Sequence, residues 1–526
     1  MTEKSEAISR RKFLCSSGAA MGLGACQWLG CAPAVLISDR QRPTVSWGVA
    51  SGDVTTDSAI IWSRTNRPAQ MIVEYAATES FKQAQRVSGS LASEASGLTA
   101  RVELERLPAG QQIFYRVAFA DLEKRRVVSE WVNGTFRTAP AQKAGVRFAF
   151  SADTAGQGFG INLDWGGMRL YETIRTTDPD FFIHSGDRIY ADGPIPSEVT
   201  LDDGSIWKNV VTPAKSKVAE TLDEFRGNYD YNLLDDNVRR LSAQVPQLVQ
   251  WDDHEVVNNW YPGEILDDDR YTVEDVSLLA RRARKAFFDY TPMRLGLGRS
   301  QRIFRSISYG PLLDVFVLDM RTYRGPNGPN RQTSPGSDTE CLGSTQLNWL
   351  KNQLERSSAV WKVVAADMPL GLIVPDGKNA IDNVANEDGR PRGREFEIAE
   401  LLAFIKARQI KNVVWVTADV HYAAAHYYDP AKAAFTDFAG FWEFVAGPMN
   451  AGTFPPRALD NTFGPQVMFQ SVPNDLKPRR PPSDGMQYFG SVTIEPEGTM
   501  TVSLHDLKGT SLYRVDLKPD GIDGSA

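Results

Sequence analysis

Short, continuous apolar segments between residues 145 and 517 constrain the fold of this chain most strongly. They cover residues 148–151, 181–184, 313–318, 363–366 and 413–416. Strands covered on both faces are apolar throughout, whereas strands with one face in water alternate. Helical patterns separate these segments, and in 395–408 one helical face carries the apolar residues Ile398, Leu401, Leu402 and Ile405. The sequence therefore predicts a layered α/β domain over residues 145–517.

The preceding stretch, residues 44–140, has the pattern of an all-β domain. Short apolar runs at 58–62 and 71–75 are separated by polar turns. A third run shows strict alternation, with apolar side chains at Ile113, Tyr115, Val117 and Phe119. Strands at this spacing are typical of a β-sandwich. Residues 107–110, Leu-Pro-Ala-Gly, resemble a turn of fibronectin type III domains, so we expect a fibronectin III- or Ig-like fold.

The first 34 residues have the features of an export signal. Arg10 and Arg11 precede a modest Gly/Ala-rich apolar run that is too short to span a bilayer stably. The arginine pair resembles a twin-arginine (Tat) signal, which implies export of the folded protein by the Tat machinery. Residues 32–34, Ala-Pro-Ala, resemble a cleavage site, whereas residues 23–26 resemble a lipoprotein box with Cys26 as the lipidated residue. We expect a periplasmic, secreted or envelope-associated protein, and the two endings of the signal stay open.

Charge and composition exclude some classes of function. The formal net charge of -7 at pH 7 argues against a basic platform that binds nucleic-acid phosphates. The 42% hydrophobic content and the 12 tryptophans are typical of a folded domain rather than a disordered chain. After the signal, no apolar stretch reaches the length of a membrane span. Metal ions or a few arginines would have to attract an anionic substrate.

An aspartate follows each of five predicted strands. These residues are Asp153, Asp187, Asp253, Asp367 and Asp419. The carboxyl ends of the strands in an α/β sheet share one edge, at which ligand sites gather. One such aspartate is commonly the N-cap of the following helix, but five at one edge indicate a common site. His254 and His421 lie beside two of them in the chain.

Carboxylates gathered in one crevice raise each other's pKa, because desolvated like charges repel. Cations between them remove this repulsion. Oxygen ligands favour hard ions such as Ca²⁺, Mg²⁺, Mn²⁺ or Fe³⁺. The sequence therefore predicts a carboxylate-rich metal site.

Four short motifs resemble those of the calcineurin-like metallophosphoesterases. Residues 186–190, Gly-Asp-Arg-Ile-Tyr, match the Gly-Asp-x-x-Tyr element of the members that use iron. Residues 251–255, Trp-Asp-Asp-His-Glu, stand where that superfamily has Gly-Asn-His-Asp/Glu. Residues 367–369 resemble its His-x-Pro, and residues 418–421, Ala-Asp-Val-His, resemble its Gly-His-x-His. Aspartate thus replaces Asn or His at three places. This pattern resembles the alkaline phosphatase D family, whose members combine a Tat signal, a small β-domain and a catalytic domain.

The resemblance implies a calcineurin-like layered β-sandwich flanked by helices, with Fe³⁺ and Ca²⁺ as cofactors. The implied metal ligands are Asp153, Asp187, Tyr190, Asp253, Asn258, Asp367, Asp419 and His421. Asp187 would bridge two metals, and Tyr190 would bind Fe³⁺ as a phenolate. Asn259 is the alternative to Asn258. Close relatives often have Cys near the first strand end, so the metal that Asp153 would bind stays open.

The candidate catalytic residues are Asp187, His254 and Arg321. By the resemblance, a hydroxide bridging the metals would attack phosphorus. His254 would stabilise the developing charge or protonate the leaving group. Arg321 follows a predicted strand and could bind phosphate bidentately, although an ion pair with Asp319 is an equal alternative.

The leading hypothesis is an exported alkaline phosphomonoesterase of broad specificity that acts on small phosphate esters. A phosphodiesterase or phospholipase D is the near alternative, because relatives in the family span both activities and phospholipids would then be substrates. A purple acid phosphatase shares Gly-Asp-x-x-Tyr and a β-domain, but its ligand set is His-rich. A non-catalytic envelope binding protein, in which the β-sandwich does the binding, is an alternative from another class.

Overall fold

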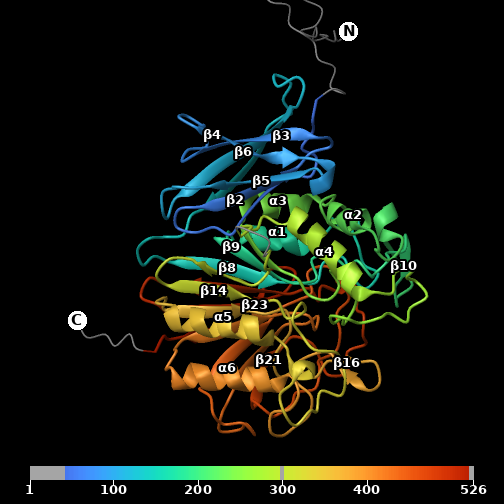
Figure 1. Ribbon diagram of the computed structural model, residues 1–526, viewed down its shortest axis with the longest axis vertical. Coiled ribbons are helices and arrows are strands. Elements are labelled where there is room, and N and C mark those ends of the chain that lie inside the picture. Colours follow the sequence, from blue (N-terminus) through green and yellow to red (C-terminus); the bar gives the residue numbers. More distant parts are fainter. Residues whose placement is uncertain (1–41, 297–300, 521–526) are drawn as a thin grey trace, which may run out of the picture. The chain divides into compact units, whose positions relative to one another are not determined.

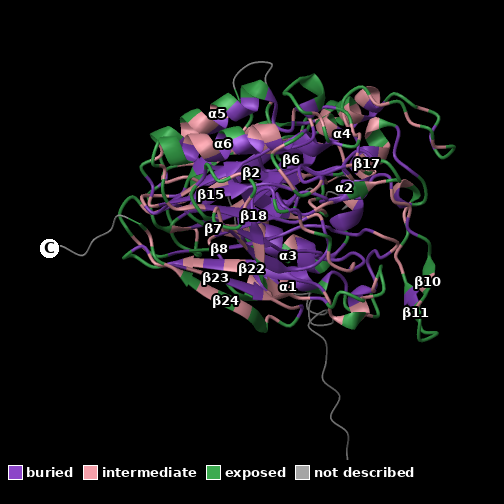
Figure 2. Ribbon diagram, turned by 90° about the horizontal axis from the view of Figure 1, so that it is seen from below, coloured by how far each residue is buried: buried purple, intermediate pink, exposed green. Residues whose placement is uncertain are grey.

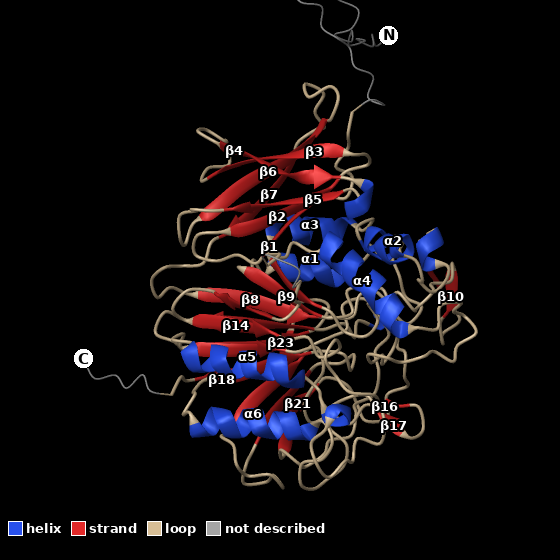
Figure 3. Ribbon diagram, viewed as in Figure 1, coloured by secondary structure: helices blue, strands red, loops and turns tan. Residues whose placement is uncertain are grey.

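Two β-sheets packed face to face, with helices on their outer faces, make up the larger part of the fold (Figures 1 and 3). The computed structural model describes residues 42–296 and 301–520. The predicted export signal and Cys26 lie outside these residues. Among the helices of the described chain, none combines the length and apolar character that crossing a membrane requires.

The first sheet has nine strands, and its centre is parallel. In spatial order the strands are β24 (Ser511–Leu517), β23 (Met500–His505), β22 (Phe489–Ile494), β8 (Val146–Ser151), β9 (Phe181–Ser185), β12 (Gln247–Gln250), β1 (Val49–Gly52), β2 (Ala59–Arg64) and β5 (Thr99–Leu104). Strands β8, β9 and β12 run parallel to one another, so they end at the same edge of the sheet.

The second sheet has seven strands and also a parallel centre. In spatial order the strands are β13 (Arg305–Ser308), β14 (Leu313–Val317), β15 (Trp361–Ala365), β18 (Val413–Thr417), β20 (Phe441–Val445), β19 (Ala424–Tyr428) and β21 (Pro465–Gln470). Strands β14, β15, β18 and β20 are parallel. Their carboxyl ends therefore also share one edge.

The central strands are apolar on both faces because each sheet packs against the other sheet on one face and against helices on the opposite face. In β15, Trp361, Val363 and Ala365 face the core between the two sheets. Val364, between them in the chain, and Ala366, after the strand, pack instead into the core beneath α5 (Gly343–Arg356) and α6 (Glu395–Ala407). Figure 2 shows these central strands as buried, with exposed residues on the outer sides of α5 and α6. The predicted uniform apolar strands and the apolar face of 395–408 are both confirmed.

Four helices cover the other face of the first sheet. They are α1 (Arg169–Thr176), α2 (Leu222–Asn232), α3 (Asp236–Gln244) and α4 (Val276–Tyr290). Leu170, Phe225, Leu241 and Phe287 from these helices pack into one core with Phe182 of β9. The order of layers is thus helices, sheet, sheet, helices, as the resemblance implied. Short elements complete the described chain: hairpins β10 (Glu198–Thr200)–β11 (Ile206–Lys208) and β16 (Pro375–Asp376)–β17 (Ala380–Ile381), and 3-10 turns at Glu94–Ser96, Pro213–Lys215, Ser337–Thr339 and Pro482–Asp484.

The N-terminal region is all-β, as predicted. Its outer sheet has the order β4 (Gln85–Ala92), β3 (Ala69–Ala76), β6 (Gln112–Asp121) and β7 (Val132–Arg137). Met71, Tyr115 and Val117 of this sheet pack against Ile61 and Leu104 of β2 and β5. Strand β1 also pairs in parallel with β12, so one half of this sandwich continues the large sheet. The domain boundaries at residues 140 and 145 stay predictions.

Backbone hydrogen bonds between neighbouring loops join the two sheet edges. Thr154 N donates to Asp187 O at 2.8 Å, which links the loops after β8 and β9. Ala418 N donates to Asp367 O at 2.9 Å, which links the loops after β15 and β18. Asn450 N, beyond β20, donates to Asp153 O at 3.1 Å and so connects one sheet to the other. These bonds fix the strand ends of both sheets at one place.

Candidate metal centre

The residues of the centre come from loops that follow β8, β9, β12 and β18, and several have a strained backbone. Asp153, Asp187, Asp419 and His421 have φ of 66°, 49°, 65° and 62°. Non-glycine residues adopt this left-handed conformation at a cost of about 1–3 kcal/mol each, and such residues cluster at functional sites. The tight turns aim their side chains back over the ends of the strands.

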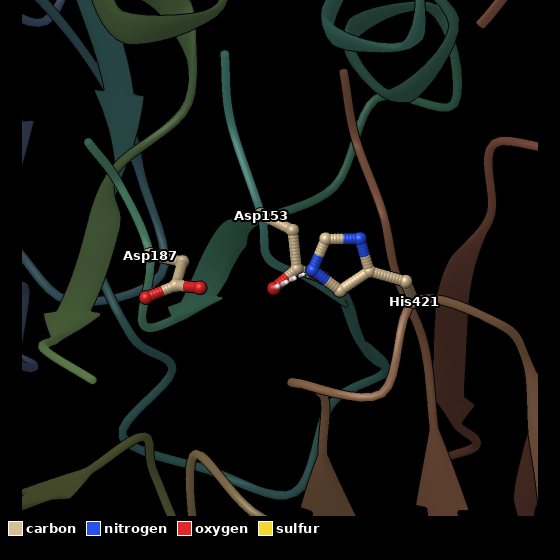
Figure 4. Close-up of side chains that lie close together, drawn as sticks. All are labelled: Asp153, Asp187 and His421. Carbon is tan, nitrogen blue, oxygen red and sulfur yellow. Dashed lines mark ion pairs between the residues drawn. The ribbon is translucent and has the colours of Figure 1, made fainter. Parts of the chain in front are cut away.

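Asp153, Asp187 and His421 form a first group, in which one ligand atom of each lies within 4.8 Å of the others. Figure 4 shows Asp153 between the other two side chains. Nε2 of His421 lies 3.7 Å from Oδ1 of Asp153. Nδ1 of His421 lies 2.5 Å from the carbonyl oxygen of Gly452 and therefore carries the proton. This tautomer leaves a lone pair on Nε2, on the side of Asp153 and the Tyr190 hydroxyl, as a metal ligand requires.

Tyr190 belongs to the same end of the centre. Its hydroxyl lies 2.9 Å from Nε2 of His421, and its ring packs on the His254 ring with the centroids 4.2 Å apart. Burial, followed by the charge of Asp187, raises the pKa of Tyr190 well above its usual value. Ionisation of the phenol here would therefore need a cation beside the oxygen.

Two further groups extend the first one. Asp187, Asp253 and His254 form the second, and Asp252, Asp253 and Asp419 form the third, each within the same 4.8 Å limit. Asp187 is shared by the first two groups and Asp253 by the last two. The three groups consequently make one continuous row of carboxylates, which we call the carboxylate row. Asp252 was not among the predicted ligands.

The carboxylate row has oxygens without partners and too little positive charge of its own. Both oxygens of Asp153 and one each of Asp187, Asp252 and Asp253 are buried without a hydrogen bond. Burial raises the pKa of Asp153, Asp187 and Asp419 well above the usual value, and neighbouring carboxylates add to the effect. Hard cations complete such a donor set, because they supply both charge and coordination to the orphaned oxygens. The residues present thus fit a metal cofactor.

Glu255 holds the loops of the centre together and was not predicted from the sequence. Its carboxylate is fully buried and accepts hydrogen bonds from Asp187 N at 3.1 Å, Arg188 N at 2.6 Å and Asp252 N at 2.8 Å. Two of these donors belong to members of the carboxylate row. Glu255 therefore positions the row rather than facing a ligand itself.

Arg321 lies beneath the carboxylate row instead of facing a substrate. Its side chain is fully buried and donates to Asp252 Oδ1 at 2.6 Å and to the two oxygens of Asp382 at 2.8 and 3.0 Å. Burial opposes ionisation of Asp382, but Arg321 and Arg324 outweigh it and lower the pKa of Asp382. Because the guanidinium already binds Asp252 and Asp382, the structure does not support the predicted bidentate contact between Arg321 and phosphate. The alternative side-chain pair with Asp319 is not formed either, because that carboxylate accepts from Trp251 Nε1 at 2.9 Å and from the amides that follow it.

The remaining predicted ligands differ in their surroundings. Asp367 is fully buried with both oxygens unpartnered, and burial together with Asp252 raises its pKa. Its Oδ2 lies 3.9 Å from Nε of Arg321, the arginine that binds Asp252 of the row. Asp367 itself belongs to none of the three ligand groups. Asn258 is exposed, and Asn259 donates its backbone N–H to Asp253 Oδ2 at 2.6 Å. The choice between the two asparagines stays open.

A polar pocket of about 320 Å³ opens onto the row. Its walls include Asp187, Asp253, His254, Asp419 and His421. A larger hollow of about 630 Å³ beside β10 and β11 contains none of these residues. The pocket is therefore the place where a small molecule can reach the metal ligands.

Comparisons with known proteins decide the family. A family model of PhoD-like phosphatases matches residues 148–504, and a model of the N-terminal domain of these phosphatases matches residues 30–140. The chain belongs to the PhoD-like phosphatase family. It is therefore a phosphoric ester hydrolase that depends on metal, rather than a non-catalytic binding protein.

Individual relatives agree with this assignment. Alkaline phosphatase D from Bacillus subtilis (strain 168) is 28% identical over 475 residues, which cover 85% of this chain and 76% of that protein. A solved structure of PhoD has a TM-score of 0.67 at 23% identity and covers 91% of this chain and 93% of that one. The purple acid phosphatase PPD1 from yellow lupin seeds has a TM-score of 0.59 at 13% identity, over 91% and 75% of the two chains. These structures confirm the calcineurin-like fold.

The raised carboxyl pKa values predict how metal-free protein responds to pH. An aspartic acid whose pKa is higher in the folded state than its unfolded value of about 3.9 keeps its proton longer when folded, so folding stability falls as pH rises between the two values. We expect the melting temperature of chelator-treated protein to fall between pH 5 and pH 8. Asp153→Asn should make this fall shallower, by about 1.4 kcal/mol per pH unit at most.

Adding Ca²⁺ and iron salts back should raise the melting temperature most at the upper end of this range, where the carboxylates are ionised. Differential scanning fluorimetry measures the melting temperature at each pH, with chelator and with added metal. Equal slopes in the chelated wild type and Asp153→Asn, together with no response to metal, would contradict a buried site that needs cations.

Proposed function

We propose that this protein is an exported alkaline phosphomonoesterase that holds Fe³⁺ and Ca²⁺ and acts on small phosphate esters. The observation that carries the proposal is the carboxylate row, buried, short of partners and open to one polar pocket. Its two ends differ in ligand type. One end combines carboxylates with the Tyr190 phenol and the His421 imidazole, whereas the other offers only oxygens.

This difference supports a separate ion at each end. Asp153, Asp187, Tyr190 and His421 would hold Fe³⁺, for which a phenolate is a suitable ligand. Asp252, Asp253 and Asp419, which form the oxygen-only group, would hold Ca²⁺, with Asp187, Asp367 and Asn258 as further oxygen donors within the centre. When bound, the ions would lower the pKa of a water molecule and neutralise charge on the phosphate.

His254 is the residue of the chain best suited to move a proton. Its Nδ1 lies 2.8 Å from Asp192 Oδ1, and Asp192 Oδ2 accepts from Asn258 N at 3.0 Å. Burial lowers the pKa of His254, but the charges of Asp192 and Asp253 outweigh it and raise the pKa to about 10. An imidazolium held in this way can donate from Nε2, on the pocket side, to the phosphate or to the departing oxygen. Asp192 positions the ring, and the sequence alone did not single it out.

The export route belongs to the same proposal. The twin-arginine sequence supports translocation of the protein after folding, which would allow metals to be inserted in the cytoplasm. The function would then be exercised in the periplasm, in the medium or at the cell envelope.

Asp187→Asn tests the catalytic role of the row. Asp187 is shared by two ligand groups, so the substitution should remove charge from both and lower kcat on a phosphomonoester by about 100-fold or more. Wild type should hydrolyse 4-nitrophenyl phosphate faster than bis(4-nitrophenyl) phosphate at alkaline pH. The measurement is initial rates for both esters, with metal content determined alongside.

A faster reaction with the diester would favour the phosphodiesterase or phospholipase D alternative. A variant as active as wild type would overturn the catalytic role of Asp187. The matched control is Asp203→Asn, a change at an acidic residue that lies outside this pocket and hydrogen-bonds within its own turn to Ser205.

Tyr190→Phe tests the iron assignment through colour. A ferric phenolate absorbs visible light by charge transfer from the ligand to the metal. Purified wild type should therefore show a visible band that Tyr190→Phe lacks, while the circular dichroism of the two proteins agrees. Absorption spectra read against iron content give the answer. Fully active protein without iron and without the band would refute Fe³⁺ at this position.

A further inference from the structure

The wall of the pocket carries an arginine that takes no part in the carboxylate row or in the contacts of His254. Arg457 lines the pocket and is exposed. Among the described residues that line it, Arg457 is the only Lys or Arg. Apart from His254, its guanidinium is thus the only cationic side chain in a pocket otherwise rich in carboxylates.

The segment that carries Arg457 is held firmly against the metal ligands. Phe454 N donates to His421 O at 3.5 Å, and the Phe454 ring stands edge-on to the His421 ring with the centroids 5.3 Å apart. The backbone N–H of Arg457 donates to the hydroxyl of Tyr422 at 3.2 Å. Tyr422 follows His421 directly and is buried. The backbone of Arg457 is therefore fixed relative to the row.

The far side of this segment is anchored as well. Ile373 N donates to Ala458 O at 2.8 Å, and Leu459 forms an antiparallel bridge with Leu372. The chain that continues from Leu372 forms the next part of the pocket wall at Val374 and Pro375. A side chain on such a support loses little backbone freedom when it binds a ligand.

In the described part of the chain, the guanidinium of Arg457 makes no hydrogen bond and no ion pair. No hydrogen bond or ion pair joins it to the acidic residues of the pocket. Asp376, on the same wall as Pro375, uses its two carboxylate oxygens on Asn259 Nδ2 at 3.0 Å and Asn327 Nδ2 at 2.9 Å. By contrast, Arg321 and Arg324 are buried and both donate hydrogen bonds to Asp382. The positive charge of Arg457 is thus available to an incoming molecule.

We propose that Arg457 binds a second anionic group on the substrate, so that the enzyme prefers phosphate esters whose leaving group carries a carboxylate or a further phosphate. The proposal rests on the proposed function, because the scissile phosphate must lie at the carboxylate row for the leaving group to face Arg457. Both anions present paired oxygens that match the guanidinium fork. Neutral leaving groups lack this contact, and cationic ones are repelled.

Phosphate esters of matched shape test the preference. The probes are 4-carboxyphenyl phosphate, 1,4-phenylene bisphosphate and the neutral 4-acetylphenyl phosphate. The readout is the ratio of kcat/KM for each anionic ester to that for the neutral one. Differences in the intrinsic reactivity of the esters cancel when this ratio is compared between wild type and variant.

Arg457→Ala should lower the ratio about tenfold, mainly through KM, as expected for loss of one partly exposed charge-assisted hydrogen-bonded pair. Arg457→Lys should retain part of the preference, and Arg457→Glu should lower the ratio further than alanine does. Metal content and melting temperature should match those of wild type, because the side chain is exposed and makes no hydrogen bond or ion pair with described residues. A loss confined to one of the two anionic esters identifies whether carboxylate or phosphate is recognised.

Arg479→Ala is the matched control. Arg479 is also exposed and close to the pocket, where it donates to Gln157 O at 3.2 Å, but it does not line the cavity. Its removal should change the ratio less than twofold. Equal effects of the two variants would mean general attraction of anions and would overturn the specific contact.

An unchanged ratio in Arg457→Ala would also overturn the inference while leaving the phosphatase activity intact. If wild type hydrolyses none of the three esters, the proposed function fails and this inference fails with it.

Discussion

The repulsion among buried carboxylates is the constraint on which the structure of the site depends. Asp153, Asp187, Asp253 and Asp419 converge from two different sheets, and the guanidinium of Arg321, which contacts the row at Asp252, is shared with the buried Asp382. Without cations, burial favours protonated acids, which cannot serve as ligands. The row is therefore built for metal ions, and its stability and chemistry both follow from their presence.

The surrounding fold supplies the rigidity that this repulsion demands. Parallel strands in both sheets end at one place, and the loop after β20 is hydrogen-bonded to the loop after β8. Glu255 fixes the amides of Asp187 and Asp252, while Arg321 and Asp382 form a buried ion pair beneath the row. Removing one member of such a pair leaves an uncompensated charge, which costs about 3–5 kcal/mol. These contacts hold like charges together until metals neutralise them.

The sequence could predict the features that depend on local pattern. Apolar strands followed by aspartate identified the layered fold, and Gly-Asp-x-x-Tyr placed Tyr190 beside Asp187. Contacts between distant residues left weaker signals. Nothing in the pattern around Arg321 distinguishes a guanidinium that meets Asp382 from one that meets a ligand, because the choice depends on how two loops pack. The pairing of β1 with β12, across nearly 200 residues, likewise depends on tertiary register.

Asp192 and Asp252 show how near a motif a missed residue can lie. Each is adjacent to, or within a few positions of, a residue that the motifs identified, yet its role depends on side-chain direction. Asp192 turns to His254, and Asp252 reaches both Asp419 and Arg321. A carboxylate beside a known ligand is thus a candidate for the same site, and only its geometry decides whether it binds metal or positions another group.

A crystal structure of protein purified after native export, with anomalous diffraction recorded across the iron edge, would show whether the carboxylate row holds two different metal ions. We expect an iron peak among Asp153, Asp187, Tyr190 and His421 and a second, non-iron cation between Asp252, Asp253 and Asp419. Density that shows the carboxylate row free of metal in fully active protein would contradict this expectation.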